Sequence, residues 1–257
     1  HAWSPDVYQG APTPVTAFMA AATKIAAFGA MLRIYYTVFA NAQWSWTPVL
    51  SGIAIVTMLL GSLVAIAQRD VKRMLAYSSI AHAGFLLSGV VALNKDGLAA
   101  SLFYLFAYGL TTIAAFGIIT LVRDSSGEVT DLNRWIGIGK KSPLVAAAFS
   151  FILLSFAGIP LTSGFIGKFA IFSAAYKSGN ISLVVVGVLS SAIAAFFYIR
   201  VIVLMFFTDA TEDGTSVEIP SILTQATVVI ALVVTVALGV YPAPLLEFIT
   251  NLATFIR

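Results

Sequence analysis

Residues 156–164 read FAGIPLTSG and lie at the centre of an apolar run, 143–176, that is too long for one straight membrane-spanning helix. Pro160 lacks a backbone donor, and the glycines on either side lower the cost of departing from helical angles. The stretch therefore predicts a discontinuous helix. Broken helices at membrane depth line cavities, and in transporters they mark the path of the ion or substrate. Lys168 follows the proline by about two turns.

The composition places the whole chain in the membrane. Hydrophobic residues make up 60% of it and charged residues 10%, and the mean hydropathy is +0.97. Only helices or closed barrels satisfy the backbone in lipid, and no period-2 strand pattern appears. We expect an all-α integral membrane protein, a polytopic helical bundle of about seven spans with one broken helix. The expected spans are residues 15–39, 49–68, 72–93, 98–122, 143–176, 181–207 and 222–241.

Several kinds of chemistry are excluded by residue counts. The chain has no cysteine, which rules out disulfides, iron–sulfur clusters and thiolate metal sites, and its two histidines favour neither a haem nor a histidine-rich metal site. The net charge of +3 comes from residues that lie almost entirely between the apolar runs, so it bears on topology and not on nucleic acid. Because the chain opens at His1, in a polar loop, we expect a missing upstream portion.

The lysines and arginines predict an orientation. Seven fall on one side of the predicted spans and three on the other, and the positive-inside rule makes the first side cytoplasmic. The seven are Arg69, Lys72, Arg73, Arg123, Arg134, Lys140 and Lys141, and the three are Lys95, Lys177 and Arg257. An acidic stretch at 209–218 disagrees in sign, and it could instead face a partner subunit.

Two lysines lie inside predicted spans. Lys24 falls near the middle of the first span, and Lys168 follows the predicted break. A charge at the membrane midplane costs at least about 2.5 kcal/mol, so such groups are usually functional, and proton exchange is the natural use of a desolvated lysine. The alternative is a snorkelling side chain or a structural ion pair. No Asp or Glu lies within a span, so we expect the counter-ion upstream or on a neighbour.

A third candidate, His82, shares a helical face with Ser78 and Ser79, which precede it by four and three residues. An imidazole titrates near neutrality and suits proton relay. The alternative is a histidine that only bonds a neighbouring helix. A hydrolytic Ser–His pair would need an orienting carboxylate, which neither this span nor its neighbours contains.

Three stretches carry a resemblance to a known family: HAWSPDVYQGAPTPVTAF at 1–18, DVKRMLAYSSIAH at 70–82, and 155–168. They resemble the antiporter-like membrane subunits of the proton-pumping NADH:quinone oxidoreductase, respiratory complex I, a family similar to Mrp antiporter subunits. The motif PDVYQG at 5–10 favours the N type of subunit over the M type.

The resemblance implies a fold of two inverted repeats, each with a broken helix. Residues 1–42 would end the first repeat, 43–207 would form the second with its broken helix at 143–176, and 208–257 would hold an acidic loop, a closing helix and a tail. The family's first half would be absent. Lys24 would be the connecting lysine, Lys168 the exit-side lysine, and His82 a bridge between them, together carrying proton transfer.

The same resemblance implies partners and a location. The chain would hold no cofactor or redox site, with NADH, FMN, iron–sulfur clusters and quinone on other subunits. Its partners would be other membrane subunits of complex I, the lipid bilayer and the upstream half of the same subunit, in a bacterial inner membrane that it crosses several times. The alternatives are a cation/proton antiporter subunit of Mrp or hydrogenase type and a non-pumping membrane scaffold.

Overall fold

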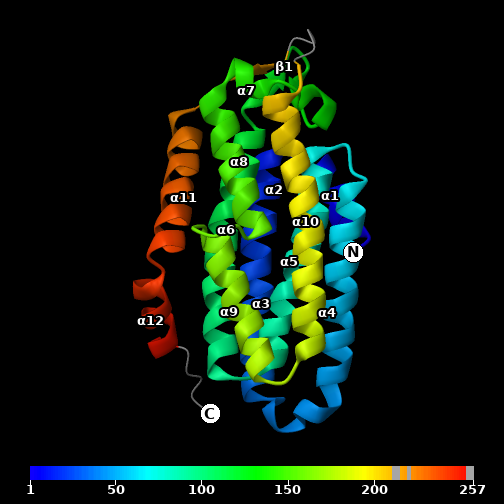
Figure 1. Cartoon of the computed structure of the whole chain (residues 1–257), viewed down its shortest axis with the longest axis vertical. Helices are drawn as coiled ribbons and strands as arrows, with labels where there is room; N and C mark the ends of the chain where they lie inside the picture. The colour runs from blue at the N-terminus through cyan, green and yellow to red at the C-terminus, as the bar shows by residue number, and fades with distance from the viewer. Residues whose placement is uncertain (210–214, 219–220, 253–257) are drawn as a thin grey trace.

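Long apolar helices run side by side in the computed structural model, which describes residues 1–209, 215–218 and 221–252 (Figure 1). Among the described residues six helical segments are long and apolar enough to cross a membrane, as the hydropathy predicted. They are α2 with η1 and α3 (Thr13–Phe18, Met19–Thr23, Lys24–Thr37), α4 (Gln43–Ile66), α5 (Val71–Ala92), α6 (Lys95–Ile119), α10 (Ile181–Phe207) and α11 (Ile222–Val240).

The fifth predicted span, 143–176, is broken, which confirms the interpretation of FAGIPLTSG. Helix α8 (Pro143–Ala157) ends at Gly158, whose φ of +84° is the left-handed conformation that glycine adopts most readily. Helix α9 (Ser163–Lys177) starts after Thr162, whose hydroxyl accepts a hydrogen bond from the backbone N–H of Phe165 at 3.4 Å. The two half-helices together take the place of one span.

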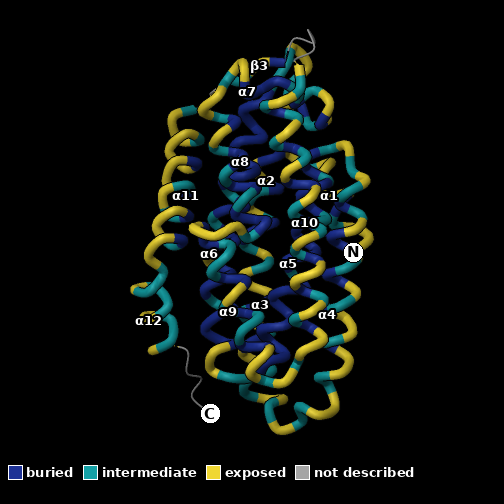
Figure 2. Tube along the Cα trace, viewed as in Figure 1, coloured by how far each residue is buried: buried dark blue, intermediate teal, exposed yellow. Residues whose placement is uncertain are grey.

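Helices α5 and α6 form the centre of the bundle, and α4, α10 and α11 pack outside them with exposed outer faces (Figure 2). The contact between α4 and α5 is close because both helices carry glycine there. A Cβ on Gly61 would lie 2.5 Å from the backbone nitrogen of Ala81, and one on Gly84 would lie 2.5 Å from Cγ of Met58. Small residues at helix contacts in membranes allow this approach.

One end of the bundle is covered by a small antiparallel sheet, order β2-β1-β3, that the sequence did not predict. Its strands have two or three residues each, too few to show an alternating pattern: β1 (Val122–Asp124), β2 (Gly127–Glu128) and β3 (Ser216–Val217). Two short helices, η3 (Leu132–Trp135) and α7 (Ile138–Lys141), complete what we call the sheet end. Hydrogen bonds from Ser126 and an ion pair with Arg134 lower the pKa of Asp124 to about 2.

The described residues of the acidic stretch, 209 and 215–218, lie at the sheet end beside cations of the same chain. Asp209 pairs with Lys140 at 2.7 Å, and Nζ of Lys141 donates to the carbonyl of Thr215 at 3.0 Å. Glu212 and Asp213 lie outside the described residues, as does Arg257 at the chain end.

Two further helices flank the spans. Helix α1 (Trp3–Gly10) packs against α5, where Asp6 pairs with Arg73 at 2.6 Å. The turn after α1 is held by Lys72, which is buried and not at the surface, and whose Nζ donates to the carbonyl of Ala11 at 2.6 Å. Helix α12 (Ala243–Leu252) follows α11 and packs against α6 at the end opposite the sheet (Figure 1).

The glycine contact between α4 and α5 can be tested within one helix. We expect Gly61→Ala to lower the stability of the chain by about 1 to 3 kcal/mol, because the new methyl would overlap the backbone of α5. Gly52→Ala, also in α4, is the matched control, since a Cβ there meets nothing within 4 Å. Thermal unfolding in detergent measures both, and equal midpoints for the two variants would contradict this account of the packing.

Candidate functional site

Lys24 is placed by an irregular turn that the sequence did not reveal. It directly follows the π-helical turn η1 and begins α3. Its Nζ donates to the carbonyl of Ser79 at 2.8 Å and to the Ser79 hydroxyl at 2.7 Å, and it lies 4.3 Å from the centre of the Tyr108 ring. A hydroxyl can accept from an ammonium and donate to a neutral amine. The Ser79 hydroxyl can therefore keep a hydrogen bond with Lys24 in either protonation state of the lysine.

His82 is buried at the centre of the bundle, with 1% of its surface exposed. Its Nδ1 lies 2.5 Å from the Tyr104 hydroxyl, and its Nε2 lies 3.4 Å from that of Tyr198. The Tyr198 hydroxyl also bonds Ser78. The predicted link between Ser78 and His82 is thus indirect, through a tyrosine of α10, and the imidazole can exchange protons with hydroxyls at both of its nitrogens.

Lys168 reaches back from α9 to the end of α8. Its Nζ donates to the carbonyls of Phe156 at 2.7 Å and Ala157 at 3.0 Å, and to the hydroxyl of Ser191 on α10 at 2.7 Å. The side chain passes Gly158, where a Cβ would lie 3.0 Å from Cδ of the lysine. The break thus supplies the lysine with both its oxygen ligands and the room to reach them.

The three candidates follow one another inside the bundle, in an order that we call the line, because Tyr108 contacts both Lys24 and His82 and Phe85 contacts both His82 and Lys168. Among the described residues no hydrogen bond joins one candidate directly to another. The Tyr108 ring lies between the first two, since it contacts Nζ of Lys24 and its centre is 4.6 Å from that of the His82 ring. Every hydrogen-bond partner that the described residues offer Lys24 and Lys168 is a neutral oxygen. Within the described part of the chain neither ammonium pairs with a carboxylate.

Four residues at this site were missed by the sequence analysis: Tyr104, Tyr108, Ser191 and Tyr198. The first two are four residues apart on α6 and so share a face, which is a signal that the sequence contains. Ser191 and Tyr198 are seven residues apart on α10 and also share a face. Nothing local indicates that this face turns towards His82, because the contact joins residues 116 positions apart.

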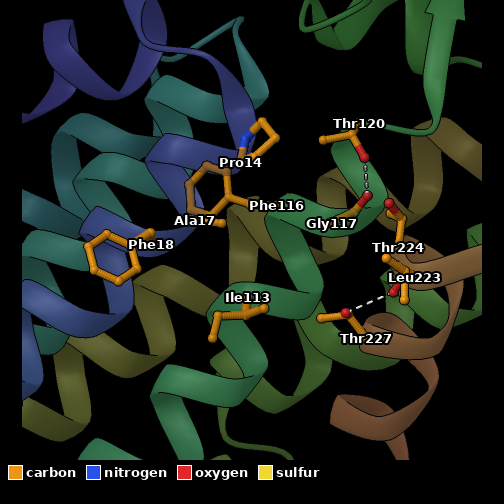
Figure 3. A pocket seen from close by; sticks show the side chains of 10 residues that line it. All are labelled: Pro14, Ala17, Phe18, Ile113, Phe116, Gly117, Thr120, Leu223, Thr224 and Thr227. Carbon is orange, nitrogen blue, oxygen red and sulfur yellow. Dashed lines mark hydrogen bonds between the residues drawn. The ribbon is translucent and has the colours of Figure 1, made fainter. Parts of the chain in front are cut away.

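A groove of about 380 Å³ between α2, α6 and α11 is a separate feature (Figure 3). Its ten lining residues include Phe18, Phe116 and three threonines, and none of the ten is titratable. The hydroxyls of Thr120 and Thr227 bond carbonyls of their own helices, at 2.6 and 2.8 Å. The groove is therefore apolar and offers no group for proton exchange.

Comparison with known proteins supports the resemblance seen in the motifs. Residues 1–194 match the family of transmembrane domains described as NADH:quinone oxidoreductase/Mrp antiporter. The chain is 58% identical over 257 residues to NADH-quinone oxidoreductase subunit N of Rhodococcus opacus (strain B4), an alignment that covers 100% of this chain and 48% of that protein. The subunit N 3 of Streptomyces griseus is also 58% identical, with 46% of its length covered. The chain thus spans about half the length of the curated relatives it matches.

Two solved assemblies contain chains with this fold. One is respiratory complex I from Thermus thermophilus with bound aureothin, with a TM-score of 0.82 and 35% identity over 96% of this chain and 54% of that one. The other is the Mrp complex from Dietzia sp. DQ12-45-1b, with a TM-score of 0.87 and 26% identity over 98% and 55%. Since the family match covers three quarters of the sequence and the fold recurs in both assemblies, the chain belongs to the NADH:quinone oxidoreductase/Mrp antiporter membrane family.

Proposed function

We propose that the chain forms part of an N-type antiporter-like subunit that moves protons across the bacterial plasma membrane within an NADH:quinone oxidoreductase. The similarity to subunit N supports the assignment to that complex. The observation that carries the proton function is a pair of lysines, half-buried Lys24 and buried Lys168, whose hydrogen-bond partners among the described residues are all neutral oxygens, with buried His82 between them. A structural ion pair would need a carboxylate, which neither lysine has among the described residues.

In this proposal Lys24, His82 and Lys168 each take up and release a proton in turn. The Ser79 hydroxyl bonds Lys24, and the ring of Tyr108 lies against its ammonium. The hydroxyls of Tyr104 and Tyr198 bond the two nitrogens of His82. A charge on one group raises the cost of charging the next, and the cost is large where water is excluded. Electrostatic repulsion between neighbouring sites would therefore drive protons along the line when charge changes at its end.

The other components of the proton-pumping complex would lie outside this chain. The relatives are about twice as long, so an upstream half of the same subunit would complete the first repeat, with residues 1–42 as its end and 43–207 as the second repeat. NADH, FMN, iron–sulfur clusters and quinone would be held by other subunits. The positive-inside rule supports a cytoplasmic location for the sheet end, where Arg123, Arg134 and Lys140 gather.

A second candidate, cation/proton antiport, is favoured by the high structural similarity to the Mrp complex. Such a protein would need free oxygens at depth to bind the cation. Here the carbonyls of Phe156 and Ala157 already bind Lys168, and the Thr162 hydroxyl donates to the carbonyl of Ile159 at 2.7 Å. The local supply of ligands for a sodium ion is therefore small, which favours protons as the transported ion.

The choice between these two functions can be made in vesicles that contain the assembled complex. We expect NADH-driven acidification to proceed equally in sodium and in choline salts, because the carbonyls of Phe156 and Ala157 at the break are already bound to Lys168. Internal pH reported by a trapped dye measures the rate. Acidification that requires sodium would support the antiporter instead.

The third alternative, a scaffold that only packs between other subunits, is tested by Lys168→Met, which keeps the aliphatic stem and removes the charge. We expect proton translocation to fall at least about tenfold, because loss of a proton-transfer group typically costs 10²–10⁴ in the step it serves. Lys177→Met, on the same helix but exposed and paired with Asp96 at 2.7 Å, is the control. Unchanged translocation in an assembled Lys168→Met complex would support the scaffold.

Replacement of Ser79 tests whether Lys24 exchanges protons through the Ser79 hydroxyl or is only packed beside it. Ser79→Ala removes the hydroxyl that can donate to the neutral amine, so we expect slower translocation with a normal amount of assembled complex. Ser88→Ala is matched to it, because Ser88 is also buried on α5 and, among the described residues, its hydroxyl donates to the carbonyl of Gly84 in its own helix. If both variants pump at the same rate, the Ser79 hydroxyl takes no part in proton transfer.

A further inference from the structure

Two phenylalanine rings separate His82 from Lys168. Phe85 lies three residues after His82 on α5, and its ring centre is 5.4 Å from that of the imidazole. The same ring lies 5.0 Å from Nζ of Lys168, so it contacts both groups. The Phe85 side chain is fully buried.

Phe156 is the second ring that contacts His82. Its ring centre is 5.6 Å from that of His82 and 5.6 Å from that of Tyr108, while its own carbonyl accepts the hydrogen bond from Lys168. Only 4% of its surface is exposed. His82 therefore contacts both apolar rings, whereas Lys168 contacts the ring of Phe85 and the backbone carbonyl of Phe156.

The hydrogen bonds of His82 and those of Lys168 form two separate groups. Both nitrogens of His82 face tyrosine hydroxyls, and Nζ of Lys168 is bound by two carbonyls and Ser191. Across the described part of the chain, no hydrogen bond joins one set of groups to the other. A proton needs a continuous chain of hydrogen bonds, and an apolar constriction without water interrupts it.

We infer that Phe85 and Phe156 form an aromatic gate that keeps the line of proton-transfer groups closed between His82 and Lys168 until water enters. This inference rests on the proposed proton function. In the open gate the imidazolium of His82 loses the proton of one N–H bond to the first water. The last water gives a proton to the neutral amine of Lys168, where a new N–H bond forms, and the water chain is unchanged in composition.

Such a gate explains why apolar rings occupy the centre of a line of polar groups. A permanently hydrated line would let protons return down their gradient. A barrier that opens only when the charge on His82 or Lys168 changes would tie passage to the driving reaction, because a new charge attracts water into an apolar gap.

The test uses the assembled complex with the full-length subunit, reconstituted into sealed vesicles with a trapped pH dye and an imposed pH gradient, without NADH. We expect Phe85→Leu to speed the decay of the gradient severalfold, because the smaller side chain leaves room for water between the two groups. Phe149→Leu is the matched control, since Phe149 is equally buried and packs on Trp135 near the sheet end, 4.9 Å between ring centres. Equal decay in the two variants would overturn the gate.

Two further variants distinguish loss of the gate from a folding defect and from failure of the proposed proton function. Phe85→Tyr keeps the ring and adds a hydroxyl, so it should also speed the decay, and NADH oxidation reports its assembly. The double variant Phe85→Leu/Lys168→Met should lose the leak, because the far side of the gate is gone. If Lys168→Met alone abolishes pumping but neither Phe85 variant leaks, only the gate is wrong. If Lys168→Met pumps normally, the proposed function itself is wrong.

Discussion

A backbone carbonyl without a partner is costly in hydrocarbon, and this constraint acts most strongly where α8 stops. The carbonyls of Phe156 and Ala157 lie at the end of that helix, where helical pairing runs out. Lys168 and Ser191 supply the missing donors, at 2.7 to 3.2 Å. The break and the lysine therefore depend on each other. Without the lysine the Phe156 carbonyl would lose its donor, and without the break the ammonium would keep only the Ser191 hydroxyl of these three oxygen partners.

Glycines on the surrounding helices let those helices pack closely around the break and Lys168. On α9, a Cβ at Gly167 would lie 2.3 Å from Cδ2 of Tyr104, so glycine there lets the ring that bonds His82 come close to the helix that carries Lys168. On α11, a Cβ at Gly239 would lie 2.3 Å from the carbonyl of Leu161, which places that helix directly against the break. Glycines on two helices thus set how closely neighbours approach the site.

The spans, the broken helix and the three ionisable candidates could be predicted because each leaves a local signal in the sequence. Each signal lies within a few turns of sequence: a run of apolar residues, a proline between glycines, or an ionisable residue in an apolar stretch. The contacts of Tyr198 with His82 and of Ser191 with Lys168 could not be predicted, because they depend on which face α10 turns inward. The small sheet escaped notice for a different reason, since its register depends on loops that meet only after the helices pack.

The π-helical turn before Lys24 also gave no sign in the sequence MAAAT, which contains neither proline nor glycine. Such a turn holds one residue more than an α-helical turn, and one residue is about 100° of rotation around the helix axis. The direction in which Lys24 points is thus set by the length of the segment before it as much as by the lysine itself. In evolutionary terms, a single inserted codon would be enough to aim a lysine at a new partner without any substitution at the lysine.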